Sequence, residues 1–130
     1  MHLPNPPVIA VIEDDAAMRE ALSELLEVTS LSCRAFDRAE AFLAEFAPGK
    51  FDCLITDLHL PGMSGLELQK KLNALGGGLP VIIVTSALDA MSETRSMEEG
   101  AFAYLTKPFN DKVLIGHVRA ALGQGEDPSS

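Results

Sequence analysis

Four separate apolar stretches of the sequence each end in polar side chains that could do chemistry together. In chain order these endings are Glu13-Asp14, Asp57, Thr85-Ser86 and Thr106-Lys107-Pro108. Taken singly, each has an ordinary explanation, because an acid can cap a helix, a threonine favours strands and a lysine can end in solvent. They become specific only if the fold brings them to one place.

Brought together, these residues would combine three carboxylates, hydroxyl groups and one ammonium group. Close carboxylates repel one another, so at neutral pH they need a cation or raised pKa values. Oxygen ligands with room for water and a phosphate suit Mg²⁺. A carboxylate beside that metal could attack a phosphoryl group, while the metal and a lysine neutralise the charge on the phosphoryl oxygens. The hydroxyl of Thr85 could donate a hydrogen bond to one of these oxygens.

The elements that must position these residues are five predicted strands alternating with five predicted helices. Apolar runs without alternation are typical of strands buried on both faces. We expect such strands at 8–12, 31–36, 53–56, 79–86 and 101–105. The alternation predicts an α/β, doubly wound, five-stranded parallel sheet with helices on both faces. In such sheets the carboxyl ends of the strands form one rim, where ligands bind.

Local patterns predict where the helices begin and which faces they bury. Asp15 and Asn110 are expected N-caps, and Asp37-Arg38-Ala39-Glu40 and Ser64-Gly65-Leu66-Glu67 have capping-box spacing. The expected inward residues are Met18, Leu22, Leu25 and Leu26, then Ala39, Phe42, Leu43 and Phe46, then Leu68, Leu72 and Leu75, and last Val113, Leu114, Val118, Ala121 and Leu122. The fourth helix, 89–99, has a thin apolar face of Met91, Thr94 and Met97, so we expect it to be the most mobile.

Length, charge and cysteine content limit the class of protein. A chain of 130 residues is expected to form one domain, at 8–122, between a proline-rich leader (1–7) and a tail or start of a linker (123–130). The net charge of −9 argues against nucleic-acid binding by this segment. No apolar run approaches the ~20 residues of a membrane span, and no signal peptide is recognisable. Cys33 and Cys53 are expected to be free core thiols, which favours a cytoplasmic location.

Four different short motifs lie far apart along the chain. They are Ile12-Glu13-Asp14-Asp15, the stretch from Thr56 to Gly65, Val84-Thr85-Ser86-Ala87 and Lys107-Pro108-Phe109. Together they resemble the receiver domains of bacterial two-component response regulators, and the resemblance covers about 8–122. In its general sequence character the chain is similar to receivers of the FixJ class, which are usually followed in the same protein by a helix-turn-helix output domain. The resemblance implies a flavodoxin-like receiver fold with strand order 2-1-3-4-5 and a cis peptide bond before Pro108.

The resemblance also implies a role for each motif residue. Asp57 would accept a phosphoryl group from a sensor histidine kinase in a Mg²⁺-dependent reaction. The Mg²⁺ would be held by Glu13, Asp14, Asp57 and the backbone carbonyl of His59. Thr85, Ser86 and Lys107 would contact the phosphoryl group, and Tyr104 would be the switch aromatic. Phosphorylation would change the face formed by the fourth helix, fifth strand and fifth helix, with homodimerisation through this face as a further hypothesis.

Three positions leave alternatives open. The first acid of the pair is often aspartate in the family, and Glu13 supplies its oxygen on a longer arm that can reach the metal through water. The His59 side chain could reach over the phosphoryl group or lie solvated in its loop. Tyr104, the only tyrosine, could be the switch or a half-buried strand aromatic.

Other functions also remain open from the sequence. A stand-alone phosphorelay shuttle would use the same residues without an output domain. A metal-dependent phosphohydrolase would want a second aspartate where His59 stands, and a cap for which the length leaves no room. A purely protein-binding pseudo-receiver would not need Asp57, Thr85 and Lys107, and a flavin carrier would need a phosphate loop where the acidic pair stands. We therefore expect a phosphoacceptor signalling domain rather than an enzyme.

Overall fold

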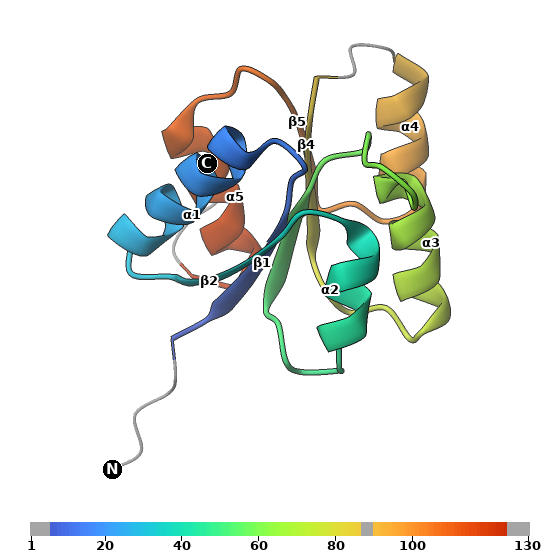
Figure 1. The fold of residues 1–130 in the computed structure, drawn as a ribbon, viewed down its shortest axis with the longest axis horizontal. Coiled ribbons are helices and arrows are strands. Elements are labelled where there is room, and N and C mark those ends of the chain that lie inside the picture. Colours follow the sequence, from blue (N-terminus) through green and yellow to red (C-terminus); the bar gives the residue numbers. More distant parts are fainter. Residues whose placement is uncertain (1–5, 87–89, 125–130) are drawn as a thin grey trace.

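Strands and helices alternate along the whole of the described chain, as the sequence predicts. The computed structural model describes residues 6–86 and 90–124. Its elements are β1 (Val8–Ile12), α1 (Ala16–Val28), β2 (Ser32–Phe36), α2 (Ala39–Glu45), β3 (Cys53–Thr56), α3 (Gly65–Ala74), β4 (Val81–Thr85), α4 (Ala90–Glu98), β5 (Ala103–Thr106) and α5 (Asp111–Ala121) (Figure 1). Most of the predicted leader (1–5), the predicted helix start at 89 and most of the predicted tail (125–130) lie outside the described residues.

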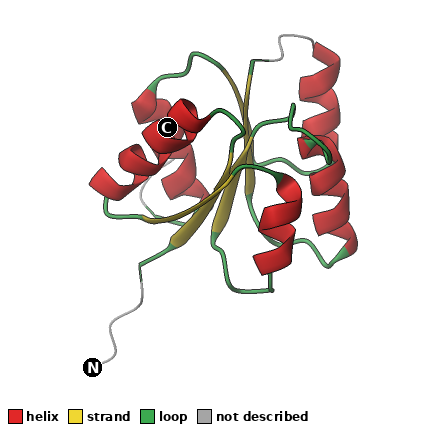
Figure 2. Cartoon of the chain, in the orientation of Figure 1, coloured by secondary structure: helices red, strands yellow, loops and turns green. Residues whose placement is uncertain are grey.

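The strands form one parallel sheet in the order β2-β1-β3-β4-β5, which confirms the predicted order. Neighbouring strands end together, because Ile12 pairs with Thr56 in β3, and Thr85 pairs with Thr106 in β5. Figure 2 shows the sheet in the middle of the molecule with helices on both sides. The residues that follow β1, β3, β4 and β5 therefore share one rim.

Two apolar cores, one on each face of the sheet, hold the helices in place. Alternate residues of β1 divide between them, with Ala10 and Ile12 in one core and Ile9 and Val11 in the other. The first core lies under α2 and α3 and the second under α1 and α5, on opposite sides of the sheet in Figure 1. Burial on both faces explains why the central strands read as continuous apolar runs rather than alternating ones.

Three of the four predicted helix caps are confirmed. Asp15 accepts a hydrogen bond from the Met18 N–H at 3.0 Å, and Asn110 accepts from the N–H groups of Lys112 and Val113. Ser64 and Glu67 form a complete capping box at the start of α3. These caps fix the starts of α1, α3 and α5, each of which follows a strand that ends at the rim.

The capping box predicted at Asp37–Glu40 is wrong. The N-cap of α2 is Arg38, whose side chain makes no cap bond, and Asp37 pairs with Arg38 at 3.1 Å instead. Glu40 turns away from its own helix and accepts a hydrogen bond from the Met63 N–H at 3.1 Å. Both acids of the pattern therefore satisfy partners other than the helix end.

The apolar face predicted for α4 is also wrong. Met91 and Met97 are 62% and 45% exposed, and Thr94 is exposed as well. The only described residue that α4 buries fully is Ser96. The helix therefore packs against the protein through its own small polar Ser96, and its two methionines are exposed.

Smaller corrections concern helix ends and strand bounds. Leu75 and Val113, predicted to face the core, are exposed. The strands predicted at 31–36, 79–86 and 101–105 are shorter or shifted, since β2 begins at Ser32, β4 spans Val81–Thr85 and β5 runs on to Thr106. Both cysteines are free, as predicted. Within the described residues, the helices are too short or too polar to cross a membrane.

Candidate functional site

The rim brings together side chains from all four predicted motifs, three of them directly at the carboxylate of Asp57 and Glu13 through Lys107. Asp57 follows β3 directly and is 6% exposed. The Thr85 hydroxyl, at the end of β4, donates to Asp57 Oδ1 at 2.8 Å, and the Lys107 ammonium, after β5, donates to Oδ2 at 2.8 Å. The His59 backbone N–H adds a third hydrogen bond to Oδ1, at 2.9 Å.

These three donors keep Asp57 ionised. Burial alone would raise the pKa of Asp57, but the hydrogen bonds from Lys107, the His59 N–H and Thr85 outweigh it and hold the pKa below its ordinary value. A carboxylate that is charged and shielded from bulk water is suited to act as a nucleophile toward an electrophilic phosphorus atom.

Lys107 joins Asp57 to the acid that ends β1. Its ammonium also donates to Glu13 Oε1 at 2.5 Å, so one cation lies between two carboxylates. Burial would lower the pKa of Lys107, but its hydrogen bonds to Asp57 and Glu13 more than offset this and raise it. Glu13 is 2% exposed, and burial raises its pKa despite the hydrogen bonds from Lys107 and from the Asp15 N–H. The two acids thus differ, with Asp57 the stronger and Glu13 the weaker.

The remaining predicted site residues lie at the edge of this cluster. Asp14 and Ser86 are exposed, next to Glu13 and Thr85 respectively. The His59 side chain is exposed in the loop after β3, while its backbone N–H contacts Asp57. Tyr104 is partly buried on β5 and packs against the core under α2 and α3. The peptide bond between Lys107 and Pro108 is cis, as predicted.

The donor set fits a divalent cation of the magnesium kind in its chemistry. Glu13, Asp14 and Asp57 supply carboxylate oxygens only, which Mg²⁺ prefers over nitrogen or sulfur ligands. Within the described residues, no three acidic, histidine or cysteine side chains are already gathered as a metal site. Lys107 instead supplies the positive charge between Glu13 and Asp57.

Comparison with known proteins assigns the chain to a family. Residues 9–119 match the family described as the response regulator receiver domain. The chain belongs to the response regulator receiver family. Receiver domains are signalling domains, and the expectation drawn from the four motifs is confirmed at this level.

Two curated relatives illustrate the similarity of this receiver domain. It is 41% identical over 125 residues to the transcriptional regulatory protein FixJ of Azorhizobium caulinodans, covering 96% of this chain and 59% of that protein. It is 38% identical over 115 residues to the response regulator protein TodT of Pseudomonas putida, covering 88% of this chain and 51% of TodT. The receiver chain therefore spans between half and three fifths of the length of these relatives.

Solved structures agree with the sequence relatives. The response regulator StyR superposes with a TM-score of 0.85 at 35% identity, covering 92% of this chain and 60% of StyR. The crystal structure named FixJ-N superposes with a TM-score of 0.83 at 31% identity, covering 95% of this chain and 98% of the other. The receiver fold, with its strand order, is shown by both the topology and these likenesses.

Three residues of the receiver that support the site were missed by the sequence reasoning. Arg19, on α1, donates to the backbone carbonyl of Glu13 at 2.9 Å. Glu40, on α2, holds the Met63 N–H in the loop after β3. Gly65 opens α3 against the Asp57 backbone, and a Cβ there would lie 2.3 Å from the Asp57 carbonyl oxygen. A glycine at the first position of a capped helix is the one signal that could have indicated this close approach.

Proposed function

We propose that this receiver domain takes a phosphoryl group from a sensor histidine kinase onto Asp57. The observation that carries the proposal is the Asp57 carboxylate itself, buried at the end of β3 and held by Lys107, Thr85 and the His59 N–H. Three fixed donors around one ionised carboxylate form the kind of prearranged environment that stabilises charge in a transition state.

In the proposed transfer, an oxygen of Asp57 attacks the phosphorus of a phosphohistidine on the kinase. A P–O bond forms as the P–N bond breaks, and the leaving imidazole keeps the electron pair and takes up a proton from solvent. Lys107 and Thr85, which now bind the carboxylate, are close enough to bind phosphoryl oxygens once the group is in place. Exposed Ser86, next to Thr85, is the further hydroxyl assigned to this role.

A Mg²⁺ ion is the proposed cofactor, held by Glu13, Asp14, Asp57 and the backbone carbonyl of His59. When bound, the ion would neutralise charge on the phosphoryl oxygens. Glu13 holds its side chain within the site through Lys107 and the Asp15 N–H, and Arg19 fixes the backbone that carries the pair. To bind the ion, Glu13 would have to give up part of its contact with Lys107 in favour of a contact with the ion.

The proposed output is a change in the face formed by α4, β5 and α5. Thr85 and Tyr104 stand on neighbouring strands, with Ile83 pairing with Tyr104 and Thr85 with Thr106. A Thr85 hydroxyl drawn toward a phosphoryl group would leave Asp57 and make room for Tyr104 to pack inward. Because α4 buries only Ser96, it can respond at small cost in apolar contact.

The proposed setting is a transcriptional response regulator in the cytoplasm. Relatives named as transcriptional or response regulators are longer than this chain, which supports an output domain that the receiver controls, and the helix-turn-helix kind is the one we propose for it. Homodimerisation through the α4-β5-α5 face on phosphorylation is the proposed route to that control, and a stand-alone shuttle is the alternative.

Intact-mass spectrometry tests the acceptor directly. The protein is incubated with Mg²⁺ and acetyl phosphate beside two variants, Asp57→Asn and Asp14→Asn. One phosphoryl adduct that needs Mg²⁺, is lost in Asp57→Asn and is released by hydroxylamine is the expected result. For Asp14→Asn, we expect the adduct to require a higher Mg²⁺ concentration. An adduct that persists in Asp57→Asn would refute Asp57 as the acceptor.

A further inference from the structure

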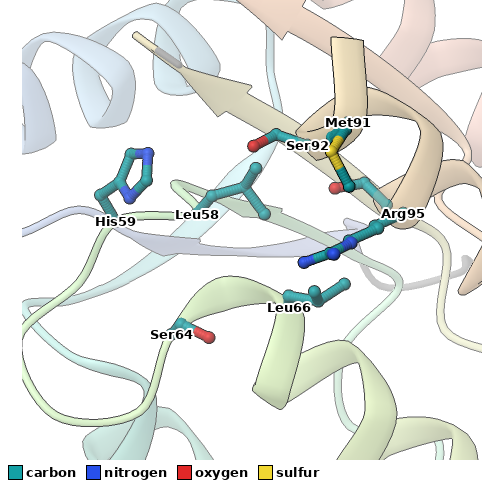
Figure 3. Close-up of a pocket in the computed structure, with 8 residues that line it drawn as sticks. Leu58, His59, Ser64, Leu66, Met91, Ser92 and Arg95 are labelled. Atoms are coloured by element: carbon teal, nitrogen blue, oxygen red, sulfur yellow. The ribbon is translucent and has the colours of Figure 1, made fainter. Parts of the chain in front are cut away.

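A cavity of about 300 Å³ lies between the loop after β3 and helix α4, beside the cluster around Asp57, since His59, whose N–H contacts Asp57, also lines it. Leu58, Leu66 and Met91 give it its apolar lining, and the other described residues that line it are polar: His59, Ser64, Ser92, Arg95 and Ser96. Figure 3 shows these three side chains converging on the space, with the hydroxyls of Ser64 and Ser92 at its edges. An apolar lining on which several polar groups converge is typical of small-molecule sites.

Of the residues that the structure describes, the one arginine or lysine that lines this cavity is Arg95. Arg95 reaches from α4 toward α3 across the opening in Figure 3. Within the described residues, its guanidinium makes no ion pair, although Glu98 follows on the same helix and Glu99 directly after it. Glu99 is engaged elsewhere, since its carboxylate accepts a hydrogen bond from Asn73 at 3.2 Å. A planar guanidinium with unused donors matches the geometry of a carboxylate.

A second, independent feature is a buried hydroxyl without a partner. Ser96 lines the same cavity and is 0% exposed, yet its Oγ makes no hydrogen bond. Behind it, Gln69 donates to the Ser96 carbonyl at 3.1 Å, and the Gln69 Oε1 is buried and unpartnered as well. Leaving buried polar atoms unpaired is costly, so a structure that retains them has a reason to do so.

We propose that this cavity binds a small organic acid, one carboxylate on a short apolar body. The carboxylate pairs with Arg95, the apolar body packs against Leu58, Leu66 and Met91, and the Ser96 hydroxyl donates its hydrogen bond to the ligand. Binding of this kind does not depend on phosphorylation of Asp57, so the two proposals can fail separately. Because Leu58 directly follows Asp57 and Met91 belongs to α4, an occupied cavity joins the acceptor loop to that helix.

Benzoate and benzamide form a matched pair of probes, since they have the same shape and only benzoate is charged. Each is titrated into the unphosphorylated, ¹⁵N-labelled full chain, and the backbone amide signals are followed by NMR. We expect benzoate to shift signals of Ser64, Leu66 and Arg95 saturably, with a dissociation constant on the order of 1 mM, and benzamide to shift them at least tenfold more weakly.

Three variants separate the proposed contacts from a general charge effect. Arg95→Gln should weaken benzoate binding by about tenfold or more, because a charge-assisted pair is lost. Lys70→Gln removes a neighbouring positive charge on α3 and should leave the affinity unchanged. Ser96→Ala should weaken binding without lowering the midpoint of urea unfolding, because it also removes an unpaired donor.

Four results would overturn the proposal, three of them in the binding data for the probes and for Arg95→Gln. These three are equal shifts with benzamide, equal binding by Arg95→Gln, or shifts that do not saturate in the region of α3 and α4. Loss of binding in Lys70→Gln to the same degree would also overturn it, since attraction by surface charge would then explain the effect.

Discussion

Replacing Gly65 by alanine should lower the stability of the fold and displace the loop after β3, which begins with Asp57. An added Cβ would lie 2.3 Å from the Asp57 carbonyl oxygen and 2.9 Å from Leu58 Cα. Both are backbone atoms, so no flexible side chain can move aside. To reach an ordinary contact the start of α3 must move away from β3 by about 1 Å, an overpacking that costs about 1–3 kcal/mol.

The same displacement strains a hydrogen bond that joins the two elements. The Gly65 N–H donates to the Leu58 carbonyl at 2.9 Å, and losing such a bond costs about 0.5–1.5 kcal/mol. Together these terms predict that Gly65→Ala lowers the free energy of unfolding by about 2–4 kcal/mol. Without the clash, alanine would instead be favoured in a helix over glycine.

Urea unfolding followed by circular dichroism measures the first effect, and the rate of adduct formation with acetyl phosphate measures the second. Ser64→Ala is the matched control, because it removes the cap of the same helix and costs about 1 kcal/mol but places no atom against Asp57. We expect slower adduct formation only in Gly65→Ala. If this variant unfolds within about 0.5 kcal/mol of the unchanged protein, the backbone relaxes freely and the reasoning is refuted.

Three further predictions concern one acid, a thiol and a helix cap. Glu13→Gln should raise the free energy of unfolding at pH 7, because a buried acid with a raised pKa destabilises the fold once it is ionised. This gain in stability should shrink as the pH falls toward the ordinary glutamate pKa. A gain that grows on acidification would contradict the raised pKa of Glu13. Burial raises the pKa of the Cys53 thiol to about 12, so an alkylating reagent at pH 8 should modify Cys53 only in urea. Rapid labelling of the folded protein would contradict the burial of β3. Asn110→Ala should cost about 1 kcal/mol in urea unfolding while Asn110→Asp should cost little, and equal losses in both would show that the cap does not act through its side-chain oxygen.

The central strands and the rim could be predicted because β1, β3 and β4 are short, almost wholly apolar and end at or next to a predicted site residue. Cys53–Thr56 followed by Asp57 needs no tertiary information to be recognised as a buried strand with an acid at its end. The meeting of Asp57 with Thr85 and Lys107 follows from the parallel sheet alone.

The failures arise where a side chain chooses a distant partner over a local one. Glu40 serves Met63, which lies 23 residues away, so the local spacing that suggests a capping box says nothing about it. The sequence pattern of α4 was misleading because the one described residue that it buries fully, Ser96, is polar, while Met91 and Met97 are exposed. The close approach of Gly65 to Asp57 exists only in three dimensions.

Lys107 gives the rim its own counterion. Two buried acids that would otherwise repel one another share a single ammonium supplied by the same chain, so the folded state does not draw on dissolved cations for its integrity. A chelator should therefore leave this domain folded and remove only the stabilisation that bound Mg²⁺ adds by mass action, unlike in a protein whose metal holds it together. The domain can stay folded and ready through changes in cation supply, and only its chemistry would follow them.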